Sequence, residues 1–390
     1  MDWYVISDID QLDTPALVVY PDRVKENIRL AVEMAGGPAR LRPHVKTHKS
    51  PETTRLLLDA GIRSFKCATI AEAEMLAVTG ADDVLLAYQP IGPKAERLAA
   101  LIKKYPDTLF ACLIDNGQAA AAMAKVFSDK GLTVPVWLDL NVGMDRTGIT
   151  PGAEALQLYK EALALNGITP VGLHAYDGHV RDADLAERTK KCDEGFAKVT
   201  ALRDSIAALG SAGSPVLTCG GPSTPAPAPG HTPTPLPIIA GGSPTFPIHS
   251  RRAGIQCSPG TFVYWDKGYS DAFKEQPFSH AALVVTRVIS LRGDTRLCLD
   301  LGHKSIAPEN DLGNRVYFLN APHLRPVGQS EEHLVVEAGP GHGYDVGDVF
   351  YGVPIHICPT VALYERAFTI QGNRVTGNFK NIARDRFLSV

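Results

Sequence analysis

Several features that would assign a protein to a special class are missing from these 390 residues. No stretch approaches the roughly 18 apolar residues of a membrane-spanning helix, and the first twelve residues lack the basic-then-apolar pattern of a secretion signal. The seven cysteines are scattered without a CxxC pair, so we expect no disulfide framework and a reducing, cytoplasmic location. A net charge of -3 gives no electrostatic reason to expect nucleic acid or an anionic membrane as a partner.

Glycine and proline are abundant instead, with 35 and 29 copies, which predicts many short elements joined by tight turns. Between residues 21 and 265, stretches with helical spacing of apolar residues alternate with short apolar runs rich in β-formers. The predicted helices are Pro21–Ala35, Ala71–Thr79, Pro93–Lys104, Gly117–Lys130 and Asp182–Leu209. The predicted strands are Ser64–Ala68, Val84–Tyr88, Leu109–Ile114, Val134–Leu140 and Pro170–Ala175, with Arg40–His44, Pro237–Gly241 and Ile255–Val263 as further candidates. Continuous apolar runs are typical of parallel strands buried on both faces, and eight units in this length predict a (β/α)8 barrel over residues 21–265.

The rhythm changes after Phe273, where strand-like runs follow one another without convincing helices. We expect these strands at His280–Leu291, Thr295–Asp300, Val316–Asn320, His333–Glu337 and Ala367–Ile370. Residues 266–390 therefore predict a separate β-rich domain, and the early strand Ala16–Tyr20 could join its sheet. Eight prolines within Pro215–Pro237 predict an exposed, extended loop insertion without assigned chemistry.

The densest group of basic side chains is Arg42-Pro43-His44-Val45-Lys46-Thr47-His48-Lys49, directly after a short apolar run. In a barrel, the carboxyl ends of the strands form the active-site face. A lysine there can form a Schiff base if burial and cationic neighbours lower its pKa. A solvated charge run is the alternative interpretation.

A glycine-rich run, Gly241-Gly242-Ser243-Pro244-Thr245, follows the apolar residues Ile238–Ala240. Glycines let backbone N–H groups approach an anion, and the hydroxyls add donors, which indicates a phosphate cradle. An ordinary turn is the alternative, and a similar run at 220–224 competes for the role.

His356 and Cys358 are two residues apart in His356-Ile357-Cys358-Pro359-Thr360. In a strand they would point to one face and could bind one metal ion. Imidazole with thiolate favours zinc, and two protein ligands leave positions open for water or substrate, as in a catalytic site. A core cysteine beside a hydrogen-bonded histidine is the alternative.

In this order the three motifs resemble the D-threonine aldolase and D-serine dehydratase family, fold-type III pyridoxal phosphate (PLP) enzymes related to alanine racemase. The resemblance runs across most of the chain and includes further matching segments: Gly172–His179, Pro259–Thr261 and Glu331–His333. It implies an N-terminal PLP-binding barrel, a C-terminal metal-bearing β domain that includes residues 1–20, and a homodimer. It also implies that Lys46 binds PLP, that Gly242, Ser243 and Thr245 hold its phosphate, and that His356 and Cys358 bind a divalent metal. Zinc is the expected metal, with manganese or magnesium as alternatives.

Weaker candidates follow other strand ends. Tyr176 and His179 come after Pro170–Ala175, and Arg146 follows Val134–Leu140, so all three are expected at the barrel mouth. His179 is a candidate base for a β-hydroxyl, whereas His44, Arg146, Tyr176 and Gly241 are candidate cofactor contacts. A hydrogen-bonding role for His179 and a surface salt bridge for Arg146 are the alternatives. Asp177 could orient His179 or cap the next helix.

The predicted reaction acts on a small D-β-hydroxy-α-amino acid. In the family, Cys at the second metal position is found in D-serine dehydratases and Asp in D-threonine aldolases. Cys358 therefore favours a dehydratase, which eliminates the β-hydroxyl to give a keto acid and ammonia. The alternative is an aldolase, which breaks the Cα–Cβ bond to give glycine and an aldehyde. Rival hypotheses are an amino-acid racemase, which has no need of a metal, a PLP-binding protein without turnover, and a metal-dependent barrel hydrolase.

Overall fold

The computed structural model describes residues 2–210 and 236–390. Residues 211–235 lie outside the described part, so neither most of the Pro-rich segment nor the glycine-rich run at 220–224 can be followed. The chain forms two compact units that are discontinuous in sequence. The sheet unit comprises Met1–Ala31, Lys46–Leu57 and Thr261–Asp385, and the barrel unit comprises Val32–Val45, Leu58–Gly260 and Arg386–Val390.

Seven parallel strands form the barrel unit, and each pairs with the next one along the chain. They are β2 (Ser64–Cys67), β3 (Asp83–Leu86), β4 (Leu109–Ile114), β5 (Val134–Leu140), β6 (Ile168–Ala175), β7 (Ile238–Ala240) and β8 (Ile255–Cys257). A core of Leu85, Ala111, Leu113, Trp137 and Ile239 packs between them. This curled sheet with surrounding helices confirms the predicted α/β barrel architecture.

The place of an eighth strand is taken by Leu41–His44, which pairs only through isolated bridges. Leu41 bridges Cys257 of β8, and His44 bridges Lys66 of β2, so this short segment joins the first and last strands of the sheet. The candidate strand near Arg40–His44 therefore lies where the eighth strand was expected, but it is limited to two bridges because Pro43 has no N–H to donate to a ladder. The predicted strand Ile255–Val263 also ends early, at Cys257, and Thr261–Val263 forms a 3-10 turn after Pro259 and Gly260.

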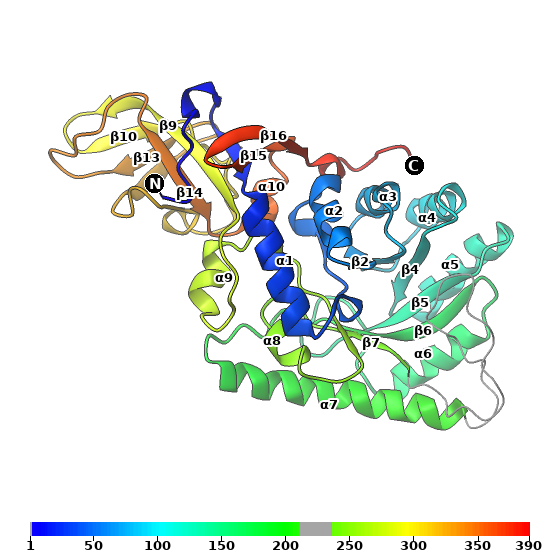
Figure 1. Cartoon of the computed structure of the whole chain (residues 1–390). Helices are drawn as coiled ribbons and strands as arrows, with labels where there is room; N and C mark the ends of the chain where they lie inside the picture. The colour runs from blue at the N-terminus through cyan, green and yellow to red at the C-terminus, as the bar shows by residue number, and fades with distance from the viewer. Residues whose placement is uncertain (1, 211–235) are drawn as a thin grey trace. The chain divides into compact units, whose positions relative to one another are not determined.

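Figure 1 shows α3, α4, α5, α6 and α7 around these strands. Their bounds are α3 (Ile70–Thr79), α4 (Pro93–Lys104), α5 (Gly117–Asp129), α6 (Ala153–Leu163) and α7 (Leu185–Gly210), and the short α8 (Phe246–His249) follows β7. The side chain of Thr69 caps α3 by accepting from the Glu72 N–H, and Gly80 ends it with φ of 95°. Helix α6 was not anticipated from the sequence.

The sheet unit contains α1 (Pro21–Ala35) except its last turn, most of α2 (Pro51–Asp59), and a mostly antiparallel sheet. The strand order is β12-β13-β10-β9-β1-β15-β16, and β14 pairs with β9 and β11. The early strand β1 (Ala16–Val19) lies between β9 and β15, which confirms that it joins the C-terminal sheet. The remaining strands are β9 (Ala282–Arg292), β10 (Arg296–Leu299), β11 (Val316–Phe318), β12 (Arg325–Gln329), β13 (Leu334–Glu337), β14 (Val349–Pro354), β15 (Arg366–Gln371) and β16 (Arg374–Lys380).

Two short helices occur where the sequence predicted none, α9 (Lys267–Ala272) and α10 (Ile357–Val361). Both begin at the buried carboxylate of Asp266. Its Oδ1 accepts from the Tyr269 N–H at 3.0 Å, and its Oδ2 accepts from the Ile357 N–H at 3.1 Å. One aspartate thus satisfies orphan donors at the start of two helices that are far apart in sequence.

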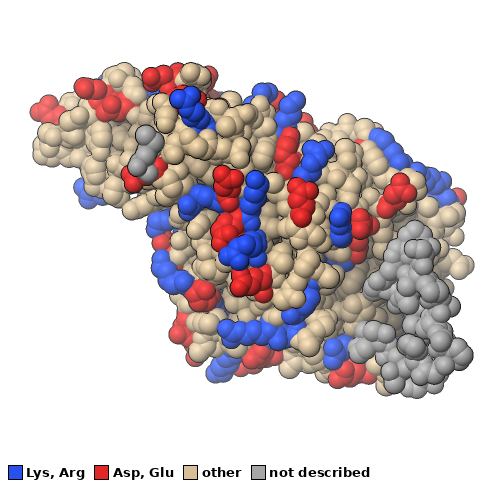
Figure 2. All heavy atoms as spheres, in the orientation of Figure 1, with Lys and Arg blue, Asp and Glu red and all other residues tan. Residues whose placement is uncertain are grey.

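No helix in residues 2–210 and 236–390 is long and apolar enough to cross a membrane. Basic and acidic side chains are interspersed over the face drawn in Figure 2, as the balanced composition predicts.

Candidate active site

The proposed cofactor lysine lies in a 3-10 turn, Val45–Thr47, at the start of a segment that belongs to the sheet unit. Lys46 is half-buried, and the side chains of Thr47 and His48 are buried. The turn places Thr47 Oγ1 3.1 Å from Cys358 Sγ. The tertiary fold therefore brings the lysine motif and the predicted metal motif together within one unit.

The metal motif is not a strand, and the prediction that His356 and Cys358 share a strand face was wrong. His356 is the N-cap residue of α10, and Cys358 lies in its first turn. The change arises because Asp266 accepts from the Ile357 N–H and starts a helix there. The helix turn nevertheless leaves the two side chains hydrogen-bonded to each other.

The electrostatics of this pair favour an ionised thiol. Burial raises the pKa of Cys358, but the hydrogen bond from His356 and the positive charge of Lys46 outweigh burial and hold the pKa below that of an ordinary thiol. Partial burial disfavours a charged His356, but its bonds to Cys358 and Glu309 and the nearby carboxylate of Asp266 raise its pKa to about 9. The thiolate is the form of cysteine that binds metals.

The donor set fits a divalent cation of zinc type. Glu309 Oε1 lies 2.7 Å from His356 Nδ1, so the ring donates from Nδ1, and Nε2 would bind a cation once it has lost the proton that it carries in the charged ring. A carboxylate on the second nitrogen is the usual partner of a metal-binding histidine. Thr261 Oγ1 also lies 3.7 Å from Cys358 Sγ. Because two protein ligands leave the coordination shell open, the set suits a catalytic ion rather than a structural one.

Three charged or titratable side chains at strand ends in the barrel unit were missed by the sequence reasoning. Lys66, Asp139 and His174 are each the penultimate residue of β2, β5 and β6, and all are almost fully buried. His174 Nδ1 lies 2.8 Å from Asp139 Oδ1, and His174 Nε2 lies 3.4 Å from Lys66 Nζ. Burial, and then the positive charge of Lys66, lower the pKa of His174. The feature of the sequence that could have revealed these three residues was one charged or titratable side chain inside each otherwise apolar run.

Tyr176 connects this group to the glycine-rich run. Its ring has Lys66 Nζ 5.6 Å and Arg146 Cζ 5.3 Å from its centroid, in cation–π geometry. A Cβ on Gly178 would lie 2.2 Å from Tyr176 Oη, and one on Gly242 would lie 2.9 Å from its Cε2. Two glycines therefore make room for the Tyr176 ring beside the proposed cradle.

Arg146 and His179 lie in exposed positions on neighbouring loops of the barrel unit. Asn141 shapes the first loop by accepting from the N–H groups of Gly143 and Asp145 at 3.0 and 3.1 Å. A Cβ on Gly143 would lie 2.7 Å from His179 Nε2, so the imidazole rests against this loop. His44 is half-buried, and its N–H donates to the Pro259 carbonyl at 3.0 Å.

All five residues of the glycine-rich run Gly241–Thr245 are buried. Gly241 has φ of 77°, and its N–H donates to the Ala175 carbonyl at 2.9 Å. Ser243 Oγ accepts from the Gly260 N–H at 3.2 Å. Ser243, Pro244 and Thr245 form a turn directly after the two glycines, and a run of this kind could hold a phosphate group.

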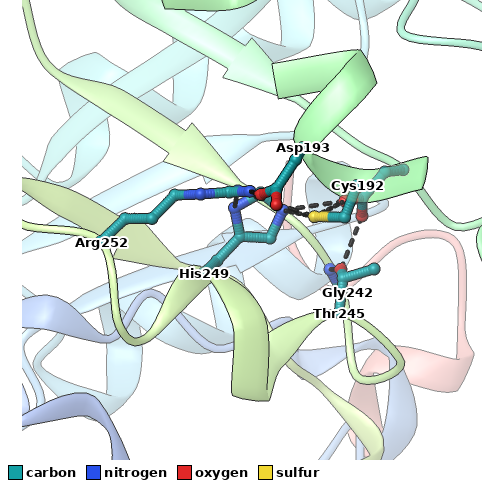
Figure 3. A network of polar contacts seen from close by, with 7 residues as sticks. Cys192, Asp193, Gly242, Thr245, His249 and Arg252 are labelled. Carbon is teal, nitrogen blue, oxygen red and sulfur yellow. Dashed lines mark hydrogen bonds and ion pairs between the residues drawn. The ribbon is translucent and has the colours of Figure 1, made fainter. Parts of the chain in front are cut away.

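Asp177 does not contact His179 in the described residues, and the next helix, α7, is capped instead by Asp184, whose Oδ1 accepts from the Glu187 N–H at 2.9 Å. The Asp177 carboxylate instead accepts from Thr245 Oγ1 at 2.6 Å and lies 2.8 Å from His249 Nε2 (Figure 3). The buried group Asp177, Cys192 and His249 is the one set of three clustered metal-ligand types among residues 2–210 and 236–390. It lies apart in sequence from His356 and Cys358, where the sequence predicted the metal.

Residues in or beside two of the other matching segments pack or pair within the protein. Tyr264 and Trp265, which follow Pro259–Thr261 in the chain, are fully buried, and Tyr264 Oη lies 2.9 Å from Thr53 Oγ1. Glu331, Glu332 and His333 are exposed, and Glu332 forms an ion pair with Lys304 at 2.9 Å.

Comparison with known proteins finds one matching family model in each half of the chain. A family model described as alanine racemase, N-terminal domain, matches residues 19–224, and one described as putative serine dehydratase domain matches residues 281–370. The chain is similar to D-threonine aldolase of Arthrobacter sp, with 26% identity over 380 residues, which cover 96% of this chain and 93% of that protein. It is also similar to D-threo-3-hydroxyaspartate dehydratase of Delftia sp. (strain HT23), with 29% identity over 266 residues, which cover 65% and 62%.

The fold has matching solved structures. D-threonine aldolase from Filomicrobium marinum superposes with a TM-score of 0.83 and 23% identity over 96% of each chain. The racemase model spans more than half of this chain, and the two relatives described above are an aldolase and a dehydratase, both lyases. The protein therefore belongs to the alanine racemase N-terminal domain family, as an enzyme of its D-threonine aldolase and D-serine dehydratase-like group of lyases.

Proposed function

We propose that this protein is a PLP-dependent, divalent-metal-assisted lyase of D-β-hydroxy-α-amino acids, of the D-serine dehydratase type. The observation that carries the proposal is the 3.1 Å contact between Thr47 and Cys358, which brings the thiol beside the turn that holds Lys46. The lowered pKa of Cys358, due in part to the positive charge of Lys46, supports the same grouping.

Lys46 would hold the cofactor covalently through its amine, and Gly241–Thr245 would hold the phosphate. When bound, PLP withdraws electrons from the bonds at the α-carbon of an attached amino acid. Lys46, when its amine is free, is the base that would take the α-proton in a dehydratase. Tyr176, Arg146 and His44 would be further contacts of the cofactor.

His356 and Cys358 would bind the metal, and zinc suits this pair of ligands best. There the ion would supply Lewis acidity to the β-oxygen of the substrate, which stabilises negative charge on a leaving hydroxide. A D-threo-3-hydroxyaspartate dehydratase of the same fold has been solved as a cysteine-to-alanine variant in a metal-free form.

An aldolase is the second candidate, because the D-threonine aldolase of Arthrobacter sp is similar over nearly the whole chain. In that reaction a base would take the proton of the β-hydroxyl, and the Cα–Cβ bond would break. His179 is our candidate for this base, since it is exposed beside the loop that carries Arg146. The thiolate ligand Cys358 favours the dehydratase.

Product analysis separates the two reactions. The purified enzyme would be supplied with D-serine, D-threonine and D-threo-3-hydroxyaspartate in separate reactions with PLP and zinc. Keto acid with ammonia from any of them supports the dehydratase, whereas glycine with an aldehyde supports the aldolase. Interconversion of D- and L-alanine without either product would support a racemase and contradict the proposal. A protein that binds no PLP would contradict the whole assignment.

We further propose that the enzyme acts as a homodimer, as the family resemblance implies. Light scattering coupled to size-exclusion chromatography would give twice the chain mass of 41.9 kDa. A single-chain mass for the active holoenzyme would contradict it.

A further inference from the structure

A buried chain of hydrogen bonds lies behind the glycine-rich run in the barrel unit (Figure 3). It runs from the Gly242 N–H to Thr245 Oγ1 at 3.3 Å, from that hydroxyl to Asp177 Oδ1 at 2.6 Å, and from Asp177 Oδ2 to His249 Nε2 at 2.8 Å. Arg252 then lies 2.5 Å from His249 Nδ1 and also pairs with Asp193. Asp177, Thr245 and His249 are all at least nine-tenths buried.

Arg252 fixes the direction of two bonds in this chain, its own bond to His249 and the bond between His249 and Asp177. A guanidinium can only donate, so His249 Nδ1 accepts and the ring proton lies on Nε2. His249 therefore donates to Asp177 from Nε2. The Thr245 hydroxyl donates to the same carboxylate, which leaves its oxygen to accept from the Gly242 N–H.

This arrangement argues against a metal ion at Asp177, Cys192 and His249. A histidine nitrogen that carries a proton has no lone pair to ligate, and Nε2 is the nitrogen that faces the other two residues. The guanidinium of Arg252 also lies 3.6 Å from Cys192 Sγ, where it would repel a cation. The adjoining cavity, lined by Val142, Val180, Phe196 and Val199 among others, measures about 10 Å³ and is too small for a substrate.

The chain of bonds instead controls the backbone of the glycine-rich run. A Cβ on Gly241 would lie 2.6 Å from His249 Cδ2 and 2.8 Å from Thr245 Oγ1, so both network members pack directly against Gly241. The Gly242 N–H is oriented by Thr245. The loop conformation is thus determined by side chains that come from β7–α8 and from the end of β6.

The charge balance also suits an anion in front of the loop. Burial alone raises the pKa of Asp177, but the bonds from His249 and Thr245 outweigh burial and hold its pKa below the usual range, so it is an anion. An unpaired buried carboxylate would repel a phosphate. Arg252, held over the Phe196 ring at 4.1 Å, supplies a compensating positive charge on the other side of His249.

We propose that Asp177, with His249 and Arg252 behind it, acts through Thr245 as a positioning group that preorganises Gly241–Thr245 to bind the phosphate of the cofactor. This inference rests on the proposed function only in assuming that PLP is the ligand. In this proposal Thr245 stabilises the loop and does not donate to the phosphate, because its hydroxyl donates to Asp177.

The test compares two cofactor forms that differ only by the phosphate. The holoenzyme would be stripped of PLP and titrated with PLP and with pyridoxal, and the dissociation constants would be measured by absorbance. Asp177→Asn and Thr245→Val are expected to weaken PLP binding about tenfold or more, because each leaves buried polar groups unpaired behind the loop. The affinity for pyridoxal should change less than about twofold, a ratio that a general loss of stability would not produce.

Two further variants sharpen the comparison. Thr245→Ser keeps the hydroxyl and should restore PLP affinity. Thr108→Val is a matched control, because it removes a buried threonine hydroxyl that donates to the Ala81 carbonyl at 2.9 Å, away from the loop. The ³¹P resonance of bound PLP in the holoenzyme should shift in Thr245→Val and stay in place in Thr108→Val.

Two results would overturn the inference. One is an equal loss of affinity for PLP and pyridoxal, and the other is unchanged PLP affinity in both Asp177→Asn and Thr245→Val. A wild-type protein that binds neither form would instead remove the proposed function and this inference with it, so the two failures are distinguishable.

Discussion

Thr47 Oγ1 lies 3.1 Å from Cys358 Sγ, although 311 residues separate them in the chain. The contact places a thiol of lowered pKa beside the turn that carries Lys46. A lysine for the cofactor and a soft ligand for a metal ion are thereby neighbours within the sheet unit. Changes at Lys46, Cys358 and Glu309 test whether this contact joins a cofactor site to a metal site.

Replacement of Lys46 should separate cofactor chemistry from folding. Lys46→Ala is expected to abolish the yellow absorption of covalently held PLP and to lower kcat by about 10²–10⁴-fold, since both attachment and proton transfer depend on the amine. Absorption spectra and steady-state kinetics would measure this. Lys49→Ala, which removes a lysine from the same motif, should keep the colour. A yellow, active Lys46→Ala enzyme would refute the assignment.

Removal of the metal should stop turnover but leave the colour. Chelation, or the substitution Cys358→Ala, is expected to remove the bound ion and to suppress elimination of the β-hydroxyl, because the Lewis acid is lost. Cys358→Asp should shift the preference from zinc towards manganese or magnesium, since a carboxylate is a harder ligand than a thiolate. Metal content after dialysis and activity with each ion are the measurements. Full activity in the chelated enzyme would exclude a metal role for His356 and Cys358.

Glu309 should support the metal through His356. The carboxylate accepts from His356 Nδ1 at 2.7 Å, so Glu309→Gln is expected to weaken metal affinity about tenfold. Competition with a zinc-binding dye measures that affinity without an activity assay. Glu365→Gln is the control, since Glu365 is an exposed residue paired with Arg366. Equal zinc affinities in the wild type, Glu309→Gln and Glu365→Gln would show that Glu309 does not orient His356.

His48 should make the folded protein sensitive to acid. Burial lowers its pKa from 6.5 to about 3, partly opposed by the hydrogen bond from the Ser50 N–H. The unfolded chain therefore binds a proton between these pH values that the folded chain does not bind. The stabilising contribution is complete above pH 6.5 and decreases as the pH falls towards about 3, by up to about 1.4 kcal/mol per pH unit.

Urea denaturation at several pH values would measure this effect. His48→Gln should flatten the dependence of the unfolding free energy on pH below 6.5. His323→Gln, at an exposed histidine, should leave the dependence as in the wild type. The same acid sensitivity in His48→Gln would show that another group is responsible.

The local pattern of the sequence was sufficient for much of the fold. Apolar runs located β4 and β5 at their observed bounds, and helical spacing located α1 and α4. Such elements are predictable because buried strands and amphipathic helices leave a periodic signal in neighbouring residues. The strand predicted around His356 was wrong, because the helix start there depends on Asp266, which lies about ninety residues earlier.

The residues of the candidate site also fall into those that could be recognised in the sequence and those that could not. Lys46, the glycine-rich run, His356 and Cys358 stand out in sequence as unusual groups of residue types. Lys66, Asp139 and His174 do not, because each is one polar residue in an apolar strand and only the parallel pairing of β2 to β6 brings their ends together.

The alternation of strands and helices in the barrel, the β-rich C-terminal half and the residue types available for chemistry could be predicted from the amino-acid sequence. They follow from hydrophobic periodicity and composition, which act locally along the chain. The contacts of Thr47 with Cys358, of Glu309 with His356, and of Asp177 with Thr245 instead of His179 are visible only in the folded protein. Such hydrogen bonds join residues from distant parts of the chain, so their partners and proton positions are set by packing, which no local pattern contains.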